Sequence, residues 1–268
     1  MKIATFNING IKARAQALLD WLDEASPDVV LLQEIKSVDE GFPLEPFEDR
    51  GYNVATHGQK SFNGVAILSK LPLEDVVRGL PGDEADDQAR WIEATVVGKQ
   101  AIRLCGLYLP NGNPVEIDAG GAPVEGGKYA YKLGWMARLK ARAEALLAAE
   151  EPALMAGDYN IIPQAEDAAR PDDWREDALF RLESREAFRR VLNLGFTEAV
   201  RSRDPAPGLY SFWDYQAGAW QKNNGIRIDH LLLTPQAADL MTGAGIDKGV
   251  RGRDKPSDHV PVWVELDL

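Results

Sequence analysis

The feature that most constrains the fold is a series of short apolar segments with the alternation of β-strands, separated by turn residues and broken by few helical patterns. Helical periodicity is confined to residues 15–23, residues 129–149 and part of the polar region 166–194. Many strands with few helices predict two β-sheets packed against each other with helices on the outside, an α/β fold. The predicted strands are residues 3–6, 29–32, 52–57, 64–69, 91–97, 102–109, 153–156, 210–213, 226–233, 244–247 and 260–266.

The bulk properties of the chain are those of an ordinary globular protein. Its 268 residues include no long linker, repeat or low-complexity stretch, so we expect one domain over residues 1–268. No apolar stretch approaches the length of a membrane span, and the first residues begin a strand instead of a signal peptide. The single cysteine, Cys105, excludes an internal disulfide and sits in an apolar run, so we expect it to be buried in a cytoplasmic protein.

The charge balance limits the kinds of partner that the chain can bind. Its 30 Lys and Arg residues against 42 Asp and Glu residues give a formal net charge of −12. Proteins that bind nucleic acids non-specifically are usually basic, because contacts to phosphates dominate their affinity. If this chain acts on a nucleic acid, it must therefore use a local basic surface or a bound divalent metal.

Polar residues recur at the points where the predicted buried strands end. A carboxylate or amide at such a point costs free energy if it is buried without a partner. Any one of them is explained by a turn or a helix cap, but the whole set favours a shared site. The set comprises Asn7, Asn9, Gln33, Glu34, Tyr108, Asp158, Asn160, Asp229, Asp258 and His259.

The side-chain chemistry of this set indicates phosphoester hydrolysis. Oxygen ligands such as Glu34 and Asp258 suit a hard divalent cation, Mg²⁺ or Mn²⁺. The three histidines are too scattered for a zinc site, and the chain has neither a nucleotide-binding P-loop nor a GxSxG elbow for acyl transfer. In metal-dependent phosphoester hydrolysis the metal polarises the phosphoryl oxygen, an aspartate activates water and a cation neutralises the transition state.

Six short motifs occur in a characteristic order along the chain. They are Thr5-Phe6-Asn7-Ile8-Asn9-Gly10, Leu32-Gln33-Glu34, Tyr108-Leu109-Pro110-Asn111-Gly112, Gly157-Asp158-Tyr159-Asn160, Gly225-Ile226-Arg227-Ile228-Asp229 and Ser257-Asp258-His259. In this order they resemble the endonuclease/exonuclease/phosphatase superfamily, and more narrowly its exonuclease III class of abasic-site endonucleases and 3′-end-processing enzymes. The resemblance runs the length of the chain. It implies a four-layer α/β sandwich of two mixed sheets, a divalent metal, and action on DNA phosphodiesters.

The resemblance also implies roles for the residues around the expected metal. Glu34 is implied as the principal metal ligand, and Asp158 as the residue that orients or deprotonates the attacking water. His259 is implied to contact the phosphate, held by Asp229 through a hydrogen bond that favours the protonated imidazole. Three further residues are implied to lie near the metal: Asn7, Asn9 and Asp258.

Substrate contacts are implied by the same motifs. Asn160 would hydrogen-bond the scissile phosphate or the nucleophile, and Tyr108 would reach a phosphate oxygen or the leaving group. The aromatic pair Phe212 and Trp213 would line a pocket for a sugar that lacks its base, although both rings could instead be core residues. The remaining candidates for substrate binding are Arg90, Asn111, Lys128 and Arg227.

The leading hypothesis is a monomeric DNA-repair nuclease, dependent on Mg²⁺ or Mn²⁺, that cuts double-stranded DNA on the 5′ side of abasic sites and processes 3′ ends. Processing of 3′ ends would include 3′→5′ exonuclease and 3′-phosphatase activity. Two alternatives stay open. A phosphatase or phosphodiesterase for inositol or lipid headgroups would share the fold and suit the acidic composition. A non-catalytic nucleic-acid-binding regulator would share the fold without the chemistry, but the intact carboxylates and histidine of the expected site oppose it.

Overall fold

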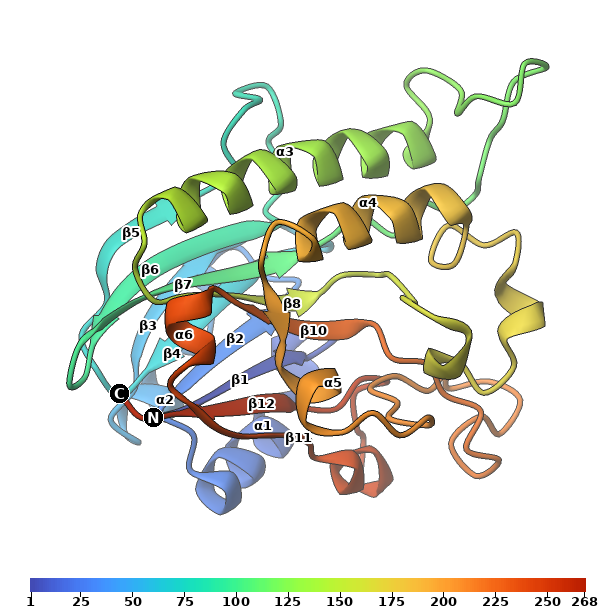
Figure 1. Cartoon of the computed structure of the whole chain (residues 1–268). Helices are drawn as coiled ribbons and strands as arrows, with labels where there is room; N and C mark the ends of the chain where they lie inside the picture. Colours follow the sequence, from blue (N-terminus) through green and yellow to red (C-terminus); the bar gives the residue numbers. More distant parts are fainter.

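Two six-stranded β-sheets lie face to face in the computed structural model, which describes residues 1–268 (Figure 1). Helices cover the outer face of each sheet, so that four layers follow one another in the order helix, sheet, sheet, helix. The predicted four-layer α/β sandwich is therefore confirmed. The two chain ends lie close together, and the ammonium of Met1 donates a hydrogen bond to the carbonyl oxygen of Leu266 at 2.6 Å.

The first sheet has the strand order β11-β12-β1-β2-β4-β3. Strands β1 and β2 run parallel and all other neighbours run antiparallel, so this sheet is mixed as predicted. Its strands are β1 (Lys2–Asn7), β2 (Val29–Gln33), β3 (Asn53–His57), β4 (Val65–Ser69), β11 (Met241–Ile246) and β12 (Val262–Leu266).

The second sheet has the order β5-β6-β7-β8-β10-β9. It repeats the arrangement of the first, because β7 and β8 form a parallel pair between antiparallel neighbours. Its strands are β5 (Glu74–Arg78), β6 (Trp91–Val97), β7 (Ala101–Tyr108), β8 (Ala153–Asp158), β9 (Thr197–Glu198) and β10 (Asp229–Leu233).

The central strands bury side chains on both faces, in alternation along each strand. In β1, Ile3 belongs to the apolar core between the sheets, whereas Ala4 belongs to the core beneath the outer helix. In β7, Leu104 belongs to the core between the sheets and Cys105 to the core beneath the helices. Cys105 is buried, as expected from its apolar surroundings. Burial on both faces explains why these segments are apolar throughout.

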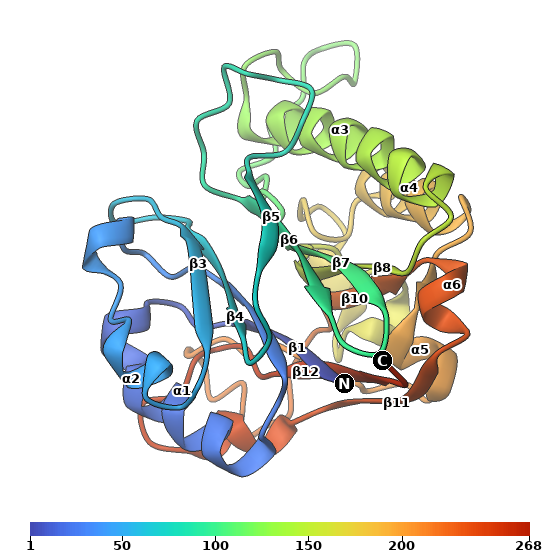
Figure 2. The ribbon, with the colours of Figure 1, turned by 90° about the vertical axis from the view of Figure 1, so that its left-hand side faces the viewer.

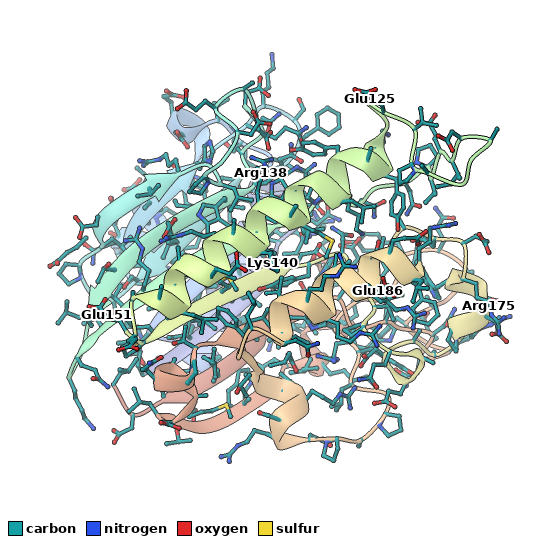
Figure 3. All side chains as sticks on the ribbon, turned by 45° about the horizontal axis from the view of Figure 1, so that its top comes forward. Glu125, Arg138, Lys140, Glu151, Arg175 and Glu186 are labelled. Carbon is teal, nitrogen blue, oxygen red and sulfur yellow. The ribbon has the colours of Figure 1, made fainter.

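Helices close the outer faces of both sheets (Figure 2). The first sheet is covered by α1 (Ile11–Ala25) and the short α2 (Glu45–Glu48), and the second by α3 (Lys128–Ala148) and α4 (Leu182–Leu192). Figure 3 shows charged side chains on the outer surface of the last two, among them Lys140 and Glu186. None of the helices is long and apolar enough to cross a membrane. The remaining short elements are α5 (Ala199–Arg203), α6 (Pro235–Ala238) and the 3₁₀ turns η1 (Asp39–Gly41), η2 (Ala165–Asp167), η3 (Pro171–Trp174) and η4 (Lys248–Gly252).

The strand pattern differs from the prediction at residues 210–213 and at the edge strands β5 and β9, which were not predicted. Residues 210–213 form no strand, because only Phe212 pairs, through single bridges to Ile226 and His259. Tyr210 and Trp213 are buried in the core of the first sheet, so burial accounts for the apolar pattern that indicated a strand. Conversely, the edge strand β5 is charged and mostly exposed, and it therefore carries no apolar alternation that would predict it.

Candidate active site

The polar residues predicted to share a site meet at one end of the two sheets, except for Gln33, whose buried side chain bonds Thr5 and the carbonyl oxygen of Leu31 instead. In the second sheet, the register places Tyr108 of β7 beside Asp158 of β8, and Asp158 opposite Asp229 of β10. From the facing sheet, Asn7 at the end of β1 donates from its side-chain Nδ2 to Asp158 Oδ2 at 2.9 Å. His259, which precedes β12, completes the group. The ends of five strands therefore bring these side chains to one point.

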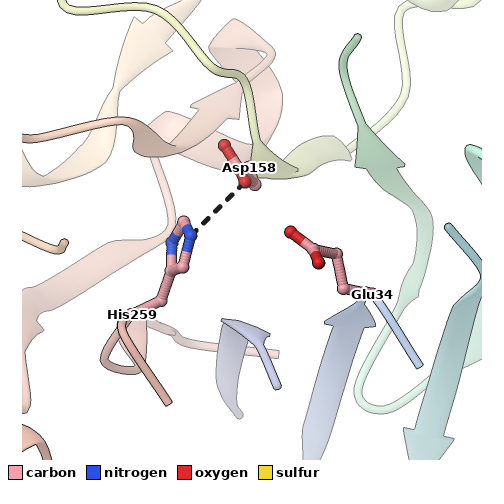
Figure 4. Close-up of side chains that lie close together, drawn as sticks. All are labelled: Glu34, Asp158 and His259. Atoms are coloured by element: carbon pink, nitrogen blue, oxygen red, sulfur yellow. Dashed lines mark ion pairs between the residues drawn. The ribbon is translucent and has the colours of Figure 1, made fainter. Parts of the chain in front are cut away.

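Asp158 lies at the centre of this group and is 1% exposed. Its Oδ1 accepts a hydrogen bond from the backbone N–H of Asn160 at 2.8 Å, and its Oδ2 accepts from Asn7. The Nε2 atom of His259 lies 3.6 Å from Oδ2 (Figure 4). Burial raises the pKa of Asp158 to about 7; His259 opposes this shift and Asp229 adds to it. A carboxyl group with a pKa near neutrality is suited to exchange a proton with water.

His259 is held in place by Asp229. The Nδ1 atom of the imidazole lies 2.9 Å from Asp229 Oδ2, which also accepts a hydrogen bond from the hydroxyl of Ser211 at 2.6 Å. Burial lowers the pKa of His259, but the carboxylates of Asp229 and Asp158 outweigh burial and raise the pKa to about 10. The imidazole is therefore protonated at neutral pH, with Nδ1–H donated to Asp229 and Nε2–H facing Asp158.

Glu34 faces this group from the first sheet, one residue beyond β2. Its Oε1 accepts from Asn7 Nδ2 at 2.9 Å, and its Oε2 lies 2.8 Å from the ammonium of Lys36. Lys36 also donates to Asn9 Oδ1 at 2.6 Å, and Asn9 donates to Asp258 Oδ1 at 3.0 Å. Burial raises the pKa of Glu34, but hydrogen bonds from Lys36 and Asn7 outweigh it and lower the pKa. Glu34 is therefore a carboxylate that the ammonium of Lys36 stabilises.

The backbone at these strand ends is left-handed at four residues that are not glycine. The φ angles are 48° at Asn9, 50° at Glu34, 49° at Lys36 and 47° at Asn160. This region costs a residue with a Cβ atom on the order of 1 kcal/mol. Four of the twelve non-glycine residues with positive φ thus lie in this one group, and backbone strain of this kind is often found at functional sites.

The group has the donors that a divalent cation requires. Atoms from Glu34, Asp158 and His259 lie within 4.8 Å of one another. His259 is a poor ligand, because a protonated imidazole has no free lone pair. The other donors are carboxylate and amide oxygens, the ligands that Mg²⁺ and Mn²⁺ prefer. The residues present therefore fit a hard divalent ion.

Three more of the expected contacts surround this centre. The guanidinium of Arg90 stacks on the ring of Tyr108 at 4.8 Å from the ring centroid. Burial and the neighbouring carboxylates raise the pKa of Tyr108 well above its usual range, so the phenol keeps its proton and remains a donor. Asn111 is exposed, and its Nδ2 donates to Asn160 Oδ1 at 3.2 Å.

Of the two aromatic residues expected in a sugar pocket, Phe212 faces the site and Trp213 does not. The ring of Phe212 packs edge-on against His259, with centroids 5.0 Å apart. Phe212 also lines a cavity of about 280 Å³ together with Trp174 and Ile226. Trp213 is 0% exposed and lies in the core of the first sheet. The substrate contact expected of Trp213 is therefore corrected to a packing role.

Arg227 also departs from its expected role in substrate binding. It is 2% exposed, and its guanidinium pairs with Asp167 at 2.8 Å and with Glu198 at 3.1 Å. A side chain enclosed and neutralised in this way cannot contact DNA, so Arg227 supports the core instead. Lys128, by contrast, is the exposed first residue of α3, where the structure leaves it accessible.

Two residues of the site were not predicted from the sequence. Lys36 binds both Glu34 and Asn9, and its position two residues after Glu34 was the only signal. Ser211 orients Asp229 through its hydroxyl, which also accepts the backbone N–H of Asp229 at 3.2 Å. A serine in an apolar segment is common in strands and turns, so it carried no distinct signal.

Comparisons with known proteins agree with this geometry. The Endonuclease/Exonuclease/phosphatase family matches residues 4–259. Exodeoxyribonuclease III of Haemophilus influenzae is 34% identical over 274 residues, which covers 99% of this chain and 100% of that protein. Similar solved structures include an AP endonuclease from Archaeoglobus fulgidus (TM-score 0.90, 34% identity) and the 3′-5′ exonuclease NExo from Neisseria meningitidis (TM-score 0.92, 33% identity), each with 100% of both chains covered. The chain therefore belongs to the endonuclease/exonuclease/phosphatase family.

Proposed function

We propose that this protein is a divalent-metal-dependent DNA-repair nuclease that hydrolyses phosphodiesters on the 5′ side of abasic sites and at 3′ ends. The observation that carries the proposal is the pairing of Asp158, whose pKa is raised to about 7, with protonated His259 at 3.6 Å. This pair offers a base for water and a cation for a phosphate in one place. Similarity to an exodeoxyribonuclease III, an AP endonuclease and a 3′-5′ exonuclease supports DNA as the substrate.

Glu34 is the proposed principal ligand of a divalent cation. When bound, the cation polarises the phosphoryl oxygen and offsets the negative charge of the site. We propose Mg²⁺ as the ion, with Mn²⁺ able to replace it, because both accept oxygen ligands. The residues proposed around it are Asn7, Asn9 and Asp258.

The other side chains have proposed roles in activating water and in binding the phosphate. Asp158 orients the attacking water and accepts its proton. The imidazolium of His259 contacts a phosphate oxygen and neutralises the charge that develops there, and Asp229 fixes the ring. The amide of Asn160 hydrogen-bonds the phosphate, and the phenol of Tyr108 donates to a phosphate oxygen or to the leaving group. Each of these groups is held by neighbours before substrate binds, as efficient electrostatic catalysis requires.

The cavity beside Phe212 is the proposed pocket for a sugar without a base. Its apolar wall includes Trp174 and Ile226, and its volume of about 280 Å³ suits a small group. We further propose that the protein acts as a monomer in the cytoplasm on double-stranded DNA. Contacts to the DNA backbone are proposed for Arg90, Asn111 and Lys128.

A comparison of four substrates tests the function. Purified protein with Mg²⁺ is assayed on an abasic duplex, a 3′-recessed duplex, a 3′-phosphate duplex and an inositol phosphate. We expect hydrolysis of the abasic duplex and of at least one 3′-end substrate, and none with the Asp158→Asn variant prepared in parallel, which controls for contaminating nucleases. Hydrolysis of the inositol phosphate alone, or of no substrate, would reject the proposal.

A further inference from the structure

A buried lysine lies directly behind the two asparagines of the proposed phosphate site. Lys132, in the first half of α3, is 0% exposed. Its ammonium donates hydrogen bonds to the backbone carbonyl oxygens of Asn160 at 2.7 Å and of Asn111 at 2.9 Å. The partners of its ammonium are thus carbonyl oxygens and not a carboxylate.

Burying an ammonium without a paired carboxylate is unfavourable for stability. Burial lowers the pKa of Lys132 to about 7, although the charges of Asp177 and Asp158 oppose the shift. An apolar side chain of similar length would avoid the cost of burying the charge, but it would leave the carbonyl oxygens of Asn111 and Asn160 without this donor. The lysine is therefore explained by the two carbonyl groups that its hydrogen bonds hold in place.

The two carbonyl groups belong to the loops that follow β7 and β8. The side chains of Asn111 and Asn160 are hydrogen-bonded to each other at 3.2 Å, and Asn160 Nδ2 donates to the carbonyl oxygen of Leu109 at 2.9 Å. Gly112, at φ +90°, packs on the lysine so closely that a Cβ atom there would lie 2.6 Å from Lys132 Cδ. Both loops are thus shaped around the lysine stem and tied to its ammonium.

We propose that Lys132 is a positioning residue for phosphate hydrolysis. By binding the carbonyl groups of Asn111 and Asn160, it fixes both loops so that the side-chain amides of the same two residues face the scissile phosphate. Its Nζ atom bonds the backbone carbonyl groups of the two residues and not their side-chain amides. The inference rests on the proposed function, because it takes these two asparagines as phosphate contacts.

A double-mutant cycle with Lys132→Met and Asn160→Ala tests the inference. The readouts are kcat and KM on a duplex with one abasic site in Mg²⁺, at a temperature where thermal unfolding shows every variant to be folded. Lys132→Met alone should lower kcat between about tenfold and a hundredfold and change KM less than about threefold, because a misplaced group weakens the transition state most. In the Asn160→Ala background, the same substitution should lower kcat by a clearly smaller factor, because one of the two amides that Lys132 positions is already gone.

Lys140→Met is the matched control, because Lys140 lies two turns further along α3 with 38% of its side chain exposed. It should behave as the wild type. An unchanged kcat in Lys132→Met, or an equal loss in both backgrounds, would overturn the inference. If Lys132→Met does not fold, Lys132→Gln, which keeps an N–H donor without the charge, replaces it in the same cycle. A wild-type protein that cleaves no DNA would overturn the proposed function. A wild type and a Lys132→Met variant that cleave DNA equally well would overturn only the role of Lys132.

Discussion

Replacing Asp158 by asparagine should stabilise the metal-free protein even though it abolishes hydrolysis. The carboxyl group is 1% exposed, and burial raises its pKa from 3.8 to about 7. A group whose pKa is higher in the folded state stabilises the fold below its unfolded pKa, and this stabilisation is lost as the pH rises through the folded pKa. At about 1.4 kcal/mol per pH unit, the interval from 3.8 to about 7 corresponds to a loss of about 4 kcal/mol above pH 7. Asparagine does not ionise and avoids this loss.

The hydrogen bonds of Asp158 set the opposing cost of the substitution. Asparagine keeps an oxygen for the backbone N–H of Asn160, but its own Nδ2 would face Nδ2 of Asn7, which now donates to Asp158 at 2.9 Å. The loss of that buried hydrogen bond costs about 1–2 kcal/mol. We therefore expect a net gain of about 2 kcal/mol at pH 8. At pH 5, ionisation of Asp158 has removed only about a third of the stabilisation that the protonated carboxyl group gives the wild type. The gain from removing this group and the cost of the lost hydrogen bond then nearly cancel.

Thermal unfolding of the metal-free wild type and of Asp158→Asn at pH 5 and pH 8 measures this difference. For a chain of this size, about 2 kcal/mol corresponds to a rise in unfolding temperature of roughly 4–8 °C. Asp239→Asn, at an exposed carboxylate, is the matched control for an Asp-to-Asn change outside the site and should leave the unfolding temperature close to that of the wild type. Mg²⁺ should narrow the gap, because a cation beside Glu34 favours ionised Asp158. An Asp158→Asn variant with the same stability relative to the wild type at both pH values would refute the reasoning.

Three shorter predictions address the core, the pocket and the metal. Arg227→Met should lower the free energy of unfolding by about 3–5 kcal/mol, since it leaves buried Glu198 without its cation. KM on abasic duplex should stay nearly constant. A raised KM together with an unchanged free energy of unfolding in chemical denaturation would instead support the original prediction that Arg227 contacts DNA. Phe212→Ala should raise KM on abasic duplex about tenfold and affect an intact 3′-recessed duplex less, because it removes one wall of the cavity; equal effects on both substrates would argue against a sugar pocket there. EDTA should abolish hydrolysis and added Mg²⁺ should restore it; full activity in chelator would exclude the proposed role of Glu34.

The strands that the sequence predicts well are those buried on both faces. Strands β2, β4 and β8 have every residue buried, and their apolar runs stand out from the polar turns on either side. Sheet pairing cannot be predicted in the same way, because residues 210–213 are as apolar as a strand and yet only Phe212 pairs with other residues. An apolar pattern reports burial. It reports sheet pairing only where a neighbouring strand is available.

The site residues that could be predicted from the sequence are those whose role depends on the local pattern and not on the whole fold. Asn7 and Asp158 were predictable because each polar group ends a buried strand, where an unpaired group is costly. Arg227 also lies in a motif, but its partner Asp167 is 60 residues away in the sequence, so nothing local indicated that the guanidinium is enclosed. Lys132 is likewise indistinguishable in the sequence from an exposed helical lysine, because its partners lie in the loops after β7 and β8.

The acidic composition of the chain and the proposed metal are linked at this site. Screening limits the repulsion between surface carboxylates and DNA to about 8 Å at physiological ionic strength, so the net charge of −12 matters least far from the contact. Within the site the balance is also negative, because four carboxylates converge and two cations, Lys36 and His259, compensate them. A phosphate adds further negative charge to this group, and it can enter only if a cation of higher charge joins it. Two of the carboxylates that make the isolated site unfavourable for DNA, Glu34 and Asp258, are thus the groups proposed to hold the ion that would make it favourable.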